Sequence, residues 1–409
     1  MNISLKIKNN VALFAFILLM MTKCSYLLPD YIGITLLTPE FIACVLSLGW
    51  CFVELRYIKM HNYKYMWIII YGIGLVLLSS YQASSLYSGQ SIIDGILCQK
   101  FALAALSLYF PVANQIKRGK MTIDEVVHVI CALAVFQIMV YTIQYIIGPN
   151  HVFLNCYYTT PRMDASVSRI RLYGTASNIT FMIMYAATKV TSEKKKMKPL
   201  IMYLLGMYYM IVINQSRSAI VVCSIALIVA LIFARGKSVK KASLIIVAVL
   251  LVAVFINSNF FQDLLETISN TTVNSHNTFA VRLRSQELYL GMLHEHPLLG
   301  GGYPDSSVSS AYILSGASQG IFAVDNGVYG FAFRYGIVGL IWLFLFFIIS
   351  IKNGIYSIYN SRDCMPFMVL IPIIVGYMTS ASWYDGFGFF YCIIYLLYYE
   401  YKDYNVIRD

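Results

Sequence analysis

The sequence predicts an all-α, polytopic membrane protein with about twelve transmembrane helices. Of its 409 residues, 59% are hydrophobic and only 12% are charged, and the mean hydropathy is +0.68, far from the values of soluble domains. Apolar stretches long enough to cross roughly 30 Å of hydrocarbon recur from one end of the chain to the other. The basic residues gather in alternate loops, which is typical of a chain that crosses a membrane repeatedly.

The apolar stretches assign the predicted helices in order. They lie at 10–28, 34–53, 66–82, 92–113, 126–147, 172–190, 199–214, 218–234, 241–258, 326–350, 366–382 and 386–400. Lys23 interrupts the first of them, and tyrosines crowd the last. No polar segment is long enough to fold alone, so we expect residues 1–409 to form a single polytopic domain.

The net charge of +11 predicts the orientation of the chain. Twelve spans put both termini on one side, and most lysines and arginines then fall into loops on that side. The opposite loops at 29–33, 83–91 and 383–385 contain none. Because basic loops stay in the cytoplasm, both termini are predicted there, and the charge indicates contact with anionic headgroups rather than with nucleic acid.

Two longer loops are expected on the outer face, at 148–171 and 259–325. The second lies between the ninth and tenth predicted helices. Within it, leucines alternating with charged residues predict an amphipathic helix over 281–295, which Pro297 ends. Gly300, Gly301 and Gly302 follow and permit backbone conformations that other residues avoid.

The outer face is expected to carry arginines and, away from helix ends, no lysine. These arginines are Arg162, Arg169, Arg171, Arg217, Arg282 and Arg284. A guanidinium offers a planar fork that binds phosphate with two hydrogen bonds, whereas an ammonium acts as a point charge. One arginine near a helix end more often reaches for lipid headgroups, but the combined pattern favours a site for a polyanion.

Arg334 is predicted inside the tenth span, about 12 Å from its start at roughly 1.5 Å per residue. An ionisable group at that depth is a functional candidate. Asn326, Gly330 and Arg334 share one helix face, where the glycine leaves room for something to approach. An open alternative is that Arg334 pairs with Glu40, Asp94 or Asp385 as a structural link; Lys100 is expected to pair with Asp94 in the same way.

The sequence contains no HExxH, DxD or P-loop motif, and no Cys/His cluster with metal-ligand spacing, so we expect neither a metal nor a cofactor. A general base on the outer face would have to be one of the few carboxylates or a histidine there.

Four blocks, in order, resemble the superfamily of bacterial O-antigen ligases and Wzy-type O-antigen polymerases. They are RLYGTASN at 171–178; NQSRSA at 214–219; Arg282, fourteen residues before His296 of HPLLGGG; and Asp325-Asn326, nine residues, then Gly336-Ile337-Val338-Gly339. Ligases carry a histidine where this chain has Asp325, a departure that favours the polymerase.

The resemblance implies a GT-C-like fold in the bacterial inner membrane. It also implies inverting, metal-independent transfer between glycans carried on undecaprenyl pyrophosphate at the periplasmic face, alongside a flippase and a chain-length regulator. Arg217, Arg282 and Asp325 would be catalytic, with Asp325 as the base. The pyrophosphate and glycan would be bound by Arg171, Arg162, Arg284, Arg334, Asn326, His296 and Asn178.

Three further alternatives stay open. Asp325 could instead cap the tenth helix at its N-terminus. The chain could be the ligase that passes the finished glycan to the lipid A core. It could also be a transporter or flippase for lipid-linked oligosaccharides, although its halves differ and its charge is concentrated on the outer face.

Overall fold

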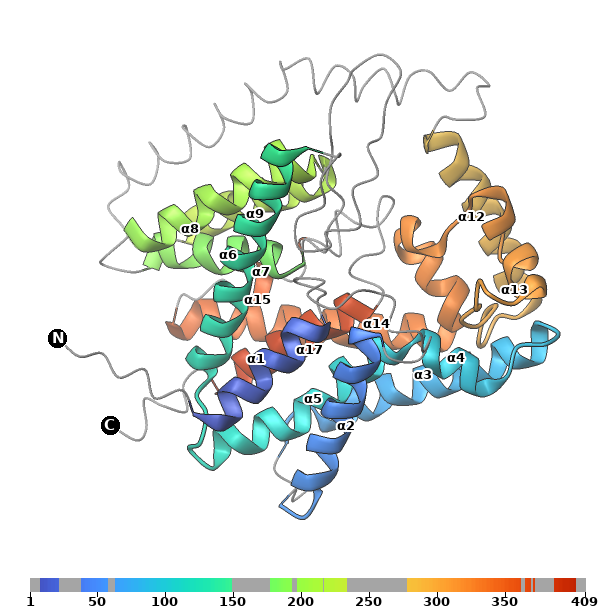
Figure 1. Ribbon diagram of the computed structural model, residues 1–409, viewed down its shortest axis with the longest axis horizontal. Helices are drawn as coiled ribbons and strands as arrows, with labels where there is room; N and C mark the ends of the chain where they lie inside the picture. Colours follow the sequence, from blue (N-terminus) through green and yellow to red (C-terminus); the bar gives the residue numbers. More distant parts are fainter. Residues whose placement is uncertain are drawn as a thin grey trace.

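The computed structural model describes residues 8–21, 38–57, 63–148, 177–192, 197–215, 217–233, 278–361, 365–368, 371 and 386–401. This part of the chain is built from helices and turns and contains no strand (Figure 1). The helices are α1 Asn9–Met21, α2 Pro39–Leu55, α3 Met66–Leu86, α4 Ile92–Cys98, α5 Lys100–Lys117, α6 Ile123–Ile147, α7 Ser177–Ser192, α8 Met197–Tyr208, α9 Arg217–Phe233, α12 Thr278–Glu295, α13 Ser309–Leu314, α14 Gly327–Ser361, α15 Met365–Met368 and α17 Gly386–Tyr401. The π-helical turn Tyr209–Asn214 extends α8, and 3₁₀ turns lie at Ala317–Gln319 and Ala323–Asp325.

Within these residues, four helices are long and apolar enough to cross a membrane: Met66–Leu86, Ile123–Ile147, Met197–Asn214 and Gly327–Tyr359. The pair α4 and α5, bent by 70°, makes a fifth if it counts as one span. The described part of the chain is therefore helical, and its apolar helices indicate a multi-pass membrane protein.

The number twelve stays a prediction. The expected span at 241–258 lies outside the described residues, and of 366–382 only 366–368 and 371 are described. Helices occupy the other predicted ranges, although several are shorter than a full crossing requires, such as α1 and α9.

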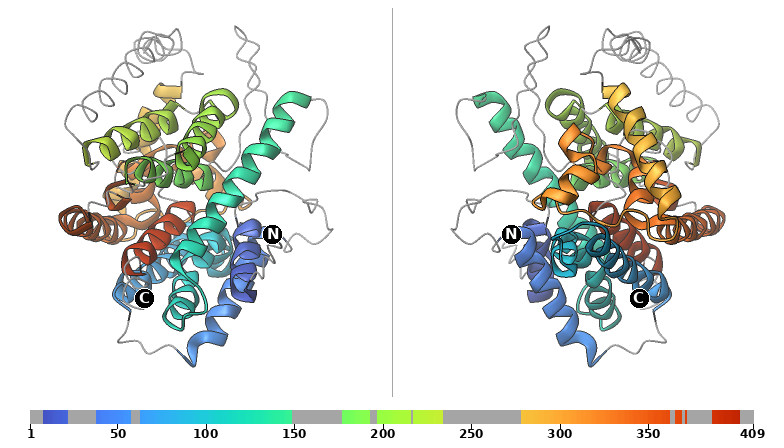
Figure 2. Two further views of the ribbon diagram at one scale, coloured as in Figure 1. Left: turned by 90° about the vertical axis from the view of Figure 1, so that its left-hand side faces the viewer. Right: turned by 90° about the vertical axis from the view of Figure 1, so that its right-hand side faces the viewer.

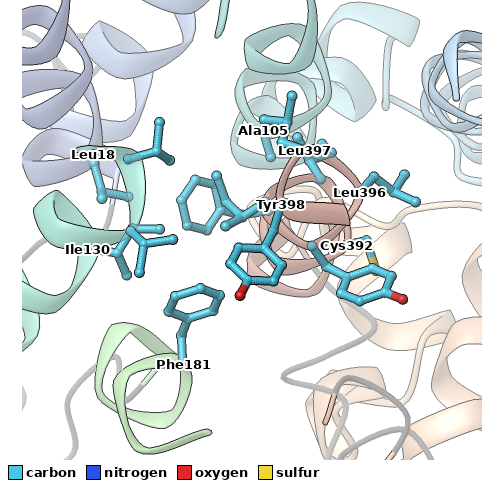
Figure 3. Packing of buried hydrophobic residues seen from close by; sticks show 14 of the residues in the cluster. Leu18, Ala105, Ile130, Phe181, Cys392, Leu396, Leu397 and Tyr398 are labelled. Atoms are coloured by element: carbon cyan, nitrogen blue, oxygen red, sulfur yellow. The ribbon is translucent and has the colours of Figure 1, made fainter. Parts of the chain in front are cut away.

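The core forms around α17. Leu18 of α1, Ala105 of α5, Ile130 of α6 and Phe181 of α7 converge on Leu397 and its neighbours in α17 (Figure 3). Because lipid tails are as apolar as these side chains, the packing stabilises the bundle mainly through close contact. Alanines along α5 allow that contact; Ala102, Ala104, Ala105 and Ala113 are all buried.

The bend between α4 and α5 is held by the side chain of Gln99, which is buried. Its Nε2 donates to the hydroxyls of Ser79 and Ser80 at 2.9 and 3.0 Å, and its Oε1 accepts from the Tyr335 hydroxyl at 3.0 Å. One amide therefore ties the bend to α3 and α14 and satisfies polar groups that would be costly in an apolar interior.

Asp94 has a local role that differs from the expected ion pair. Its carboxylate accepts from the backbone N–H and the hydroxyl of Ser91 at 2.8 and 2.7 Å, which closes a capping box at the start of α4. No ion pair between Asp94 and Lys100 occurs in the described part of the chain, so that expectation was wrong. Asp385, another suggested partner of Arg334, lies outside the described residues.

Candidate functional site

The described part of the large loop begins with α12, which confirms the helix predicted over 281–295. Ser285 and Tyr289 are its most buried side chains, and the Tyr289 ring stacks on Phe333 of α14 with centroids 4.5 Å apart. Leu288 packs against the same cluster, whereas Leu283 and Leu290 are exposed. The packed stripe of α12 is therefore narrower than the leucine pattern predicted. The right-hand view of Figure 2 faces the end of the molecule that carries α12 and α13.

Beyond α12 the chain turns sharply through the HPLLGGG segment. The helix ends at Glu295, directly before His296-Pro297, as predicted. The backbone N–H of His296 donates to the Met292 carbonyl at 2.9 Å, and the His296 carbonyl accepts from Gly300 at 2.8 Å. The His296 side chain is half-buried.

This segment, residues 296–302, forms backbone hydrogen bonds with α14 where that helix is broken, and it is called the spliced loop below. The backbone leaves the helical conformation at Gly336, where φ is 60° and ψ is −159°. The Phe333 carbonyl accepts from Gly301 at 2.7 Å, and the Ile337 N–H donates to the Pro297 carbonyl at 2.9 Å. In a regular helix Ile337 would donate to Phe333. The loop thus supplies a new partner for each group, as irregular backbone inside a membrane protein requires.

Two glycines make the splice possible. A Cβ at Gly300 would lie 2.3 Å from the Phe333 carbonyl oxygen, and one at Gly336 would lie 2.2 Å from the Leu298 carbonyl oxygen. Both residues also have positive φ. Any larger side chain would therefore clash with backbone and adopt a strained conformation. The HPLLGGG and GIVG motifs, far apart in sequence, form one structural unit.

Polar side chains at the end of α3 hold the other edge of this loop. Gln82 Nε2 donates to the Gly300 carbonyl at 3.1 Å. Gln90, which is 4% exposed, donates to the Tyr303 carbonyl at 2.9 Å and accepts from the Asp305 N–H at 2.9 Å. Sequence reasoning missed both glutamines, because an amide near the end of an apolar span carries no signal of its partner.

Arg334 is buried within the protein, with 6% of its surface exposed. Its guanidinium lies 4.4 Å from the centre of the Tyr303 ring. Such a cation–π contact contributes about 2 kcal/mol when water is excluded. Since Gln90 holds the Tyr303 backbone, Arg334 and the loop are positioned together.

Asn326 is also buried, and its amide donates to the Phe322 carbonyl at 2.9 Å. A Cβ at Gly330 would lie 1.9 Å from the Ala323 carbonyl oxygen. The space at this glycine is therefore filled by the chain's own backbone, and not left open for a ligand as expected. Since α14 begins at Gly327, the residue at the helix-capping position is Asn326, and Asp325 ends the preceding 3₁₀ turn.

Most of the remaining predicted site residues are described by their backbone position alone or lie outside the described part of the chain. Arg162 and Arg171 lie outside the described residues. Arg217 begins α9, Arg282 lies in the second turn of α12, and Asp325 ends the 3₁₀ turn; the structure describes these positions but not their side chains. Arg284 is exposed on α12. Arg282 and Arg284 are two residues apart, so their positions lie about 160° apart around the helix axis.

Asn178 is fully buried near the start of α7. Helices α7 and α9 pack together in a group that lies across the molecule from α12 and α13 (Figure 1). The structure thus places Arg334 in the first half of α14, Asn326 directly before that helix, and His296 at the start of the loop that pairs with it. That Arg217 and Arg282 meet at one pyrophosphate site stays a prediction.

Residues 202–344 match a family model described as O-antigen ligase. The match covers roughly a third of the chain, from α8 to the first half of α14, and includes the complete splice of the HPLLGGG segment into α14. No curated protein matches the chain.

Proposed function

From the match of residues 202–344 to the O-antigen ligase family model, we propose that this protein belongs to the superfamily of O-antigen ligases and polymerases and is a polymerase of lipid-linked repeat units. The family match supports glycan transfer in the synthesis of lipopolysaccharide or another surface polysaccharide. The finer activity proposed is the joining of oligosaccharides carried on undecaprenyl pyrophosphate, at the periplasmic face of the inner membrane. Asp325, where ligases carry histidine, is the observation that favours the polymerase.

The proposed reaction is a single displacement. A hydroxyl at the non-reducing end of a new repeat unit attacks the anomeric carbon of the growing chain. The bond from that carbon to the pyrophosphate oxygen breaks, and its electron pair leaves with undecaprenyl pyrophosphate. The hydroxyl proton passes to Asp325, the proposed general base.

Arginines would stabilise the negative charge that develops on the leaving pyrophosphate. We assign this role first to Arg217 and Arg282, and the binding of pyrophosphate or glycan to Arg171, Arg162, Arg284, Arg334, Asn326, His296 and Asn178. Arg334 has the best-supported position of these, because its contact with Tyr303 holds it beside the spliced loop. A group that is already positioned needs little reorganisation during the reaction.

The decisive experiment is a surface-glycan gel of a strain that lacks this protein. We expect the ladder of long chains to disappear while a single repeat unit remains attached to the lipid A core. The description of the matching family favours a second candidate, the ligase. In that case no unit would be attached, and long glycan would remain on the lipid carrier. Repeat units stranded on the cytoplasmic side would indicate a flippase and refute both assignments.

A further inference from the structure

A second cluster of cations lies at the opposite end of α3 from the spliced loop. Tyr65 precedes α3, and its buried hydroxyl accepts a hydrogen bond from Asn353 of α14 at 2.9 Å. Lys64 and Lys352 are the sequence neighbours of these two residues. The Tyr65–Asn353 bond therefore brings two lysines from distant parts of the chain to one place.

Aromatic rings hold the Lys64 ammonium in position. It lies 4.6 Å from the centre of the Tyr399 ring and 5.3 Å from that of Tyr65. Partial burial lowers the pKa of Lys64, Glu400 opposes that shift, and the positive charge of Lys352 lowers the pKa further. The Tyr65–Asn353 bond brings these two positive charges together, and an anion between them would relieve their repulsion.

The charges around this pair remain positive in sum. Lys117 lies 4.0 Å from the centre of the Tyr63 ring at the same end of the bundle. The acid in contact with the cluster is Glu400, whose carboxylate accepts from the Tyr109 hydroxyl at 2.6 Å and from the Lys64 backbone N–H at 3.4 Å. Lys64 and Lys117 therefore share a carboxylate that is already hydrogen-bonded to Tyr109, and with Lys352 the sum of these charges is positive.

An open apolar groove of about 550 Å³ runs along α14, with Lys352 in its middle. It is lined by Ile348, Ile351, Lys352, Ile355, Tyr356 and Tyr359. Their spacing of three and four residues puts them on one face of the helix. Because α14 is apolar and long enough to span a membrane, this face meets lipid rather than water.

We propose that this groove binds an anionic phospholipid of the bilayer, with its phosphate between Lys64 and Lys352 and an acyl chain along α14. Both lysines belong to the loops predicted on the cytoplasmic side, so the lipid would come from the cytoplasmic leaflet. That leaflet carries the negative surface charge that basic segments recognise. Tyr356 and Tyr359 follow Lys352 on the same face and would lie at the level of the headgroups, and tyrosine is enriched at this interface. The site is independent of the proposed polymerase reaction.

The test uses the full chain in phosphatidylcholine vesicles that contain a minor fraction of phosphatidylglycerol. Electron paramagnetic resonance of spin-labelled lipids measures how strongly the protein immobilises each lipid. We expect wild type to prefer phosphatidylglycerol. In the Lys64→Gln/Lys352→Gln variant, the affinity for phosphatidylglycerol relative to phosphatidylcholine should fall about tenfold. Ile351→Trp, which fills the groove without a change in charge, should weaken the binding of both lipids.

The matched control is Lys120→Gln/Lys198→Gln, which removes two exposed lysines of the same predicted side from outside the groove. It should keep the preference of wild type. An equal loss in this control would show that only overall charge matters and would overturn the proposal. A wild type that does not distinguish the two lipids would overturn it as well.

Discussion

Individual residues show how this bundle accommodates polar groups away from water. Arg334 is held over the Tyr303 ring, and Gln99 satisfies hydroxyls from two helices through one amide. Each arrangement replaces hydration with contacts from a different part of the chain, because unsatisfied polar groups cost several kcal/mol in hydrocarbon. Residue types were predictable from the sequence; their partners were not.

Arg217→Ala and Arg282→Ala should each abolish polymer while the protein still inserts into the membrane. Lysine at either position should restore little activity, because the two-pronged hydrogen bonding to phosphate is lost. Surface-glycan gels together with immunoblots of membrane fractions measure both effects. The control is Arg56→Lys, which should behave as wild type. Arg56 is exposed and directly follows α2, and it is not among the predicted site residues. Full activity of the lysine variants would contradict bidentate phosphate binding.

Asp325→Asn tests the proposed general base. The substitution keeps the size and the hydrogen-bonding oxygen but removes the proton-accepting carboxylate, so polymerisation should fall by about 100-fold or more. Asparagine caps helices as well as aspartate does, so a residue that only stabilises the turn would tolerate the change. The rate of chain extension in membranes is the measurement, and near-normal extension would exclude Asp325 as the base.

At the scale of elements, the break in α14 positions the loop of the candidate site. The HPLLGGG segment takes over the hydrogen bonds that Phe333 and Ile337 would otherwise form within the helix. On its other side the segment is tied to the end of α3 by Gln82 and Gln90. Two membrane helices and one loop therefore behave as a single positioned unit.

Gly336→Ala should disrupt the contact between the HPLLGGG segment and the break in α14. Alanine at a φ of 60° is strained, and its Cβ would meet the Leu298 carbonyl oxygen. We expect a loss of about 2 kcal/mol or more in stability, seen as a lower melting temperature of the purified protein, together with a loss of polymer. Gly291→Ala is the matched control, because nothing lies within 4 Å of its Cβ position on α12. Equal melting temperatures for the two variants would refute the account of the break.

At the scale of the whole molecule, the spliced loop and the Lys64–Lys352 groove lie at opposite ends of α3. The loop contacts Ser79, Gln82 and Gln90, near the C-terminal end of α3, whereas the cation cluster surrounds Tyr65 at its beginning. A 21-residue helix is about 30 Å long, which equals the thickness of the hydrocarbon core. The arrangement is consistent with one end facing each side of the membrane.

The orientation is tested by introducing single cysteines at exposed positions. Gln319→Cys, in the predicted outer loop, should react with a membrane-impermeant maleimide added to intact spheroplasts. Lys120→Cys should react only after the membrane is opened, because basic loops stay in the cytoplasm. Wild type measures the background from the native cysteines. The reverse pattern of labelling would invert the topology and remove the candidate site from the periplasmic face.

Taken by itself, the sequence determined the helical class, the multi-pass membrane character and the position of most described helices, because apolar length and turn residues act locally. It also located α12 and its end before Pro297, and it marked both glycine motifs. Tertiary structure alone decided that these motifs pair through backbone groups, that Arg334 lies over Tyr303, and that Gln82 and Gln90 hold the loop. Backbone donors and acceptors are the same in every residue except proline, so their long-range partners leave no pattern in the order of side chains.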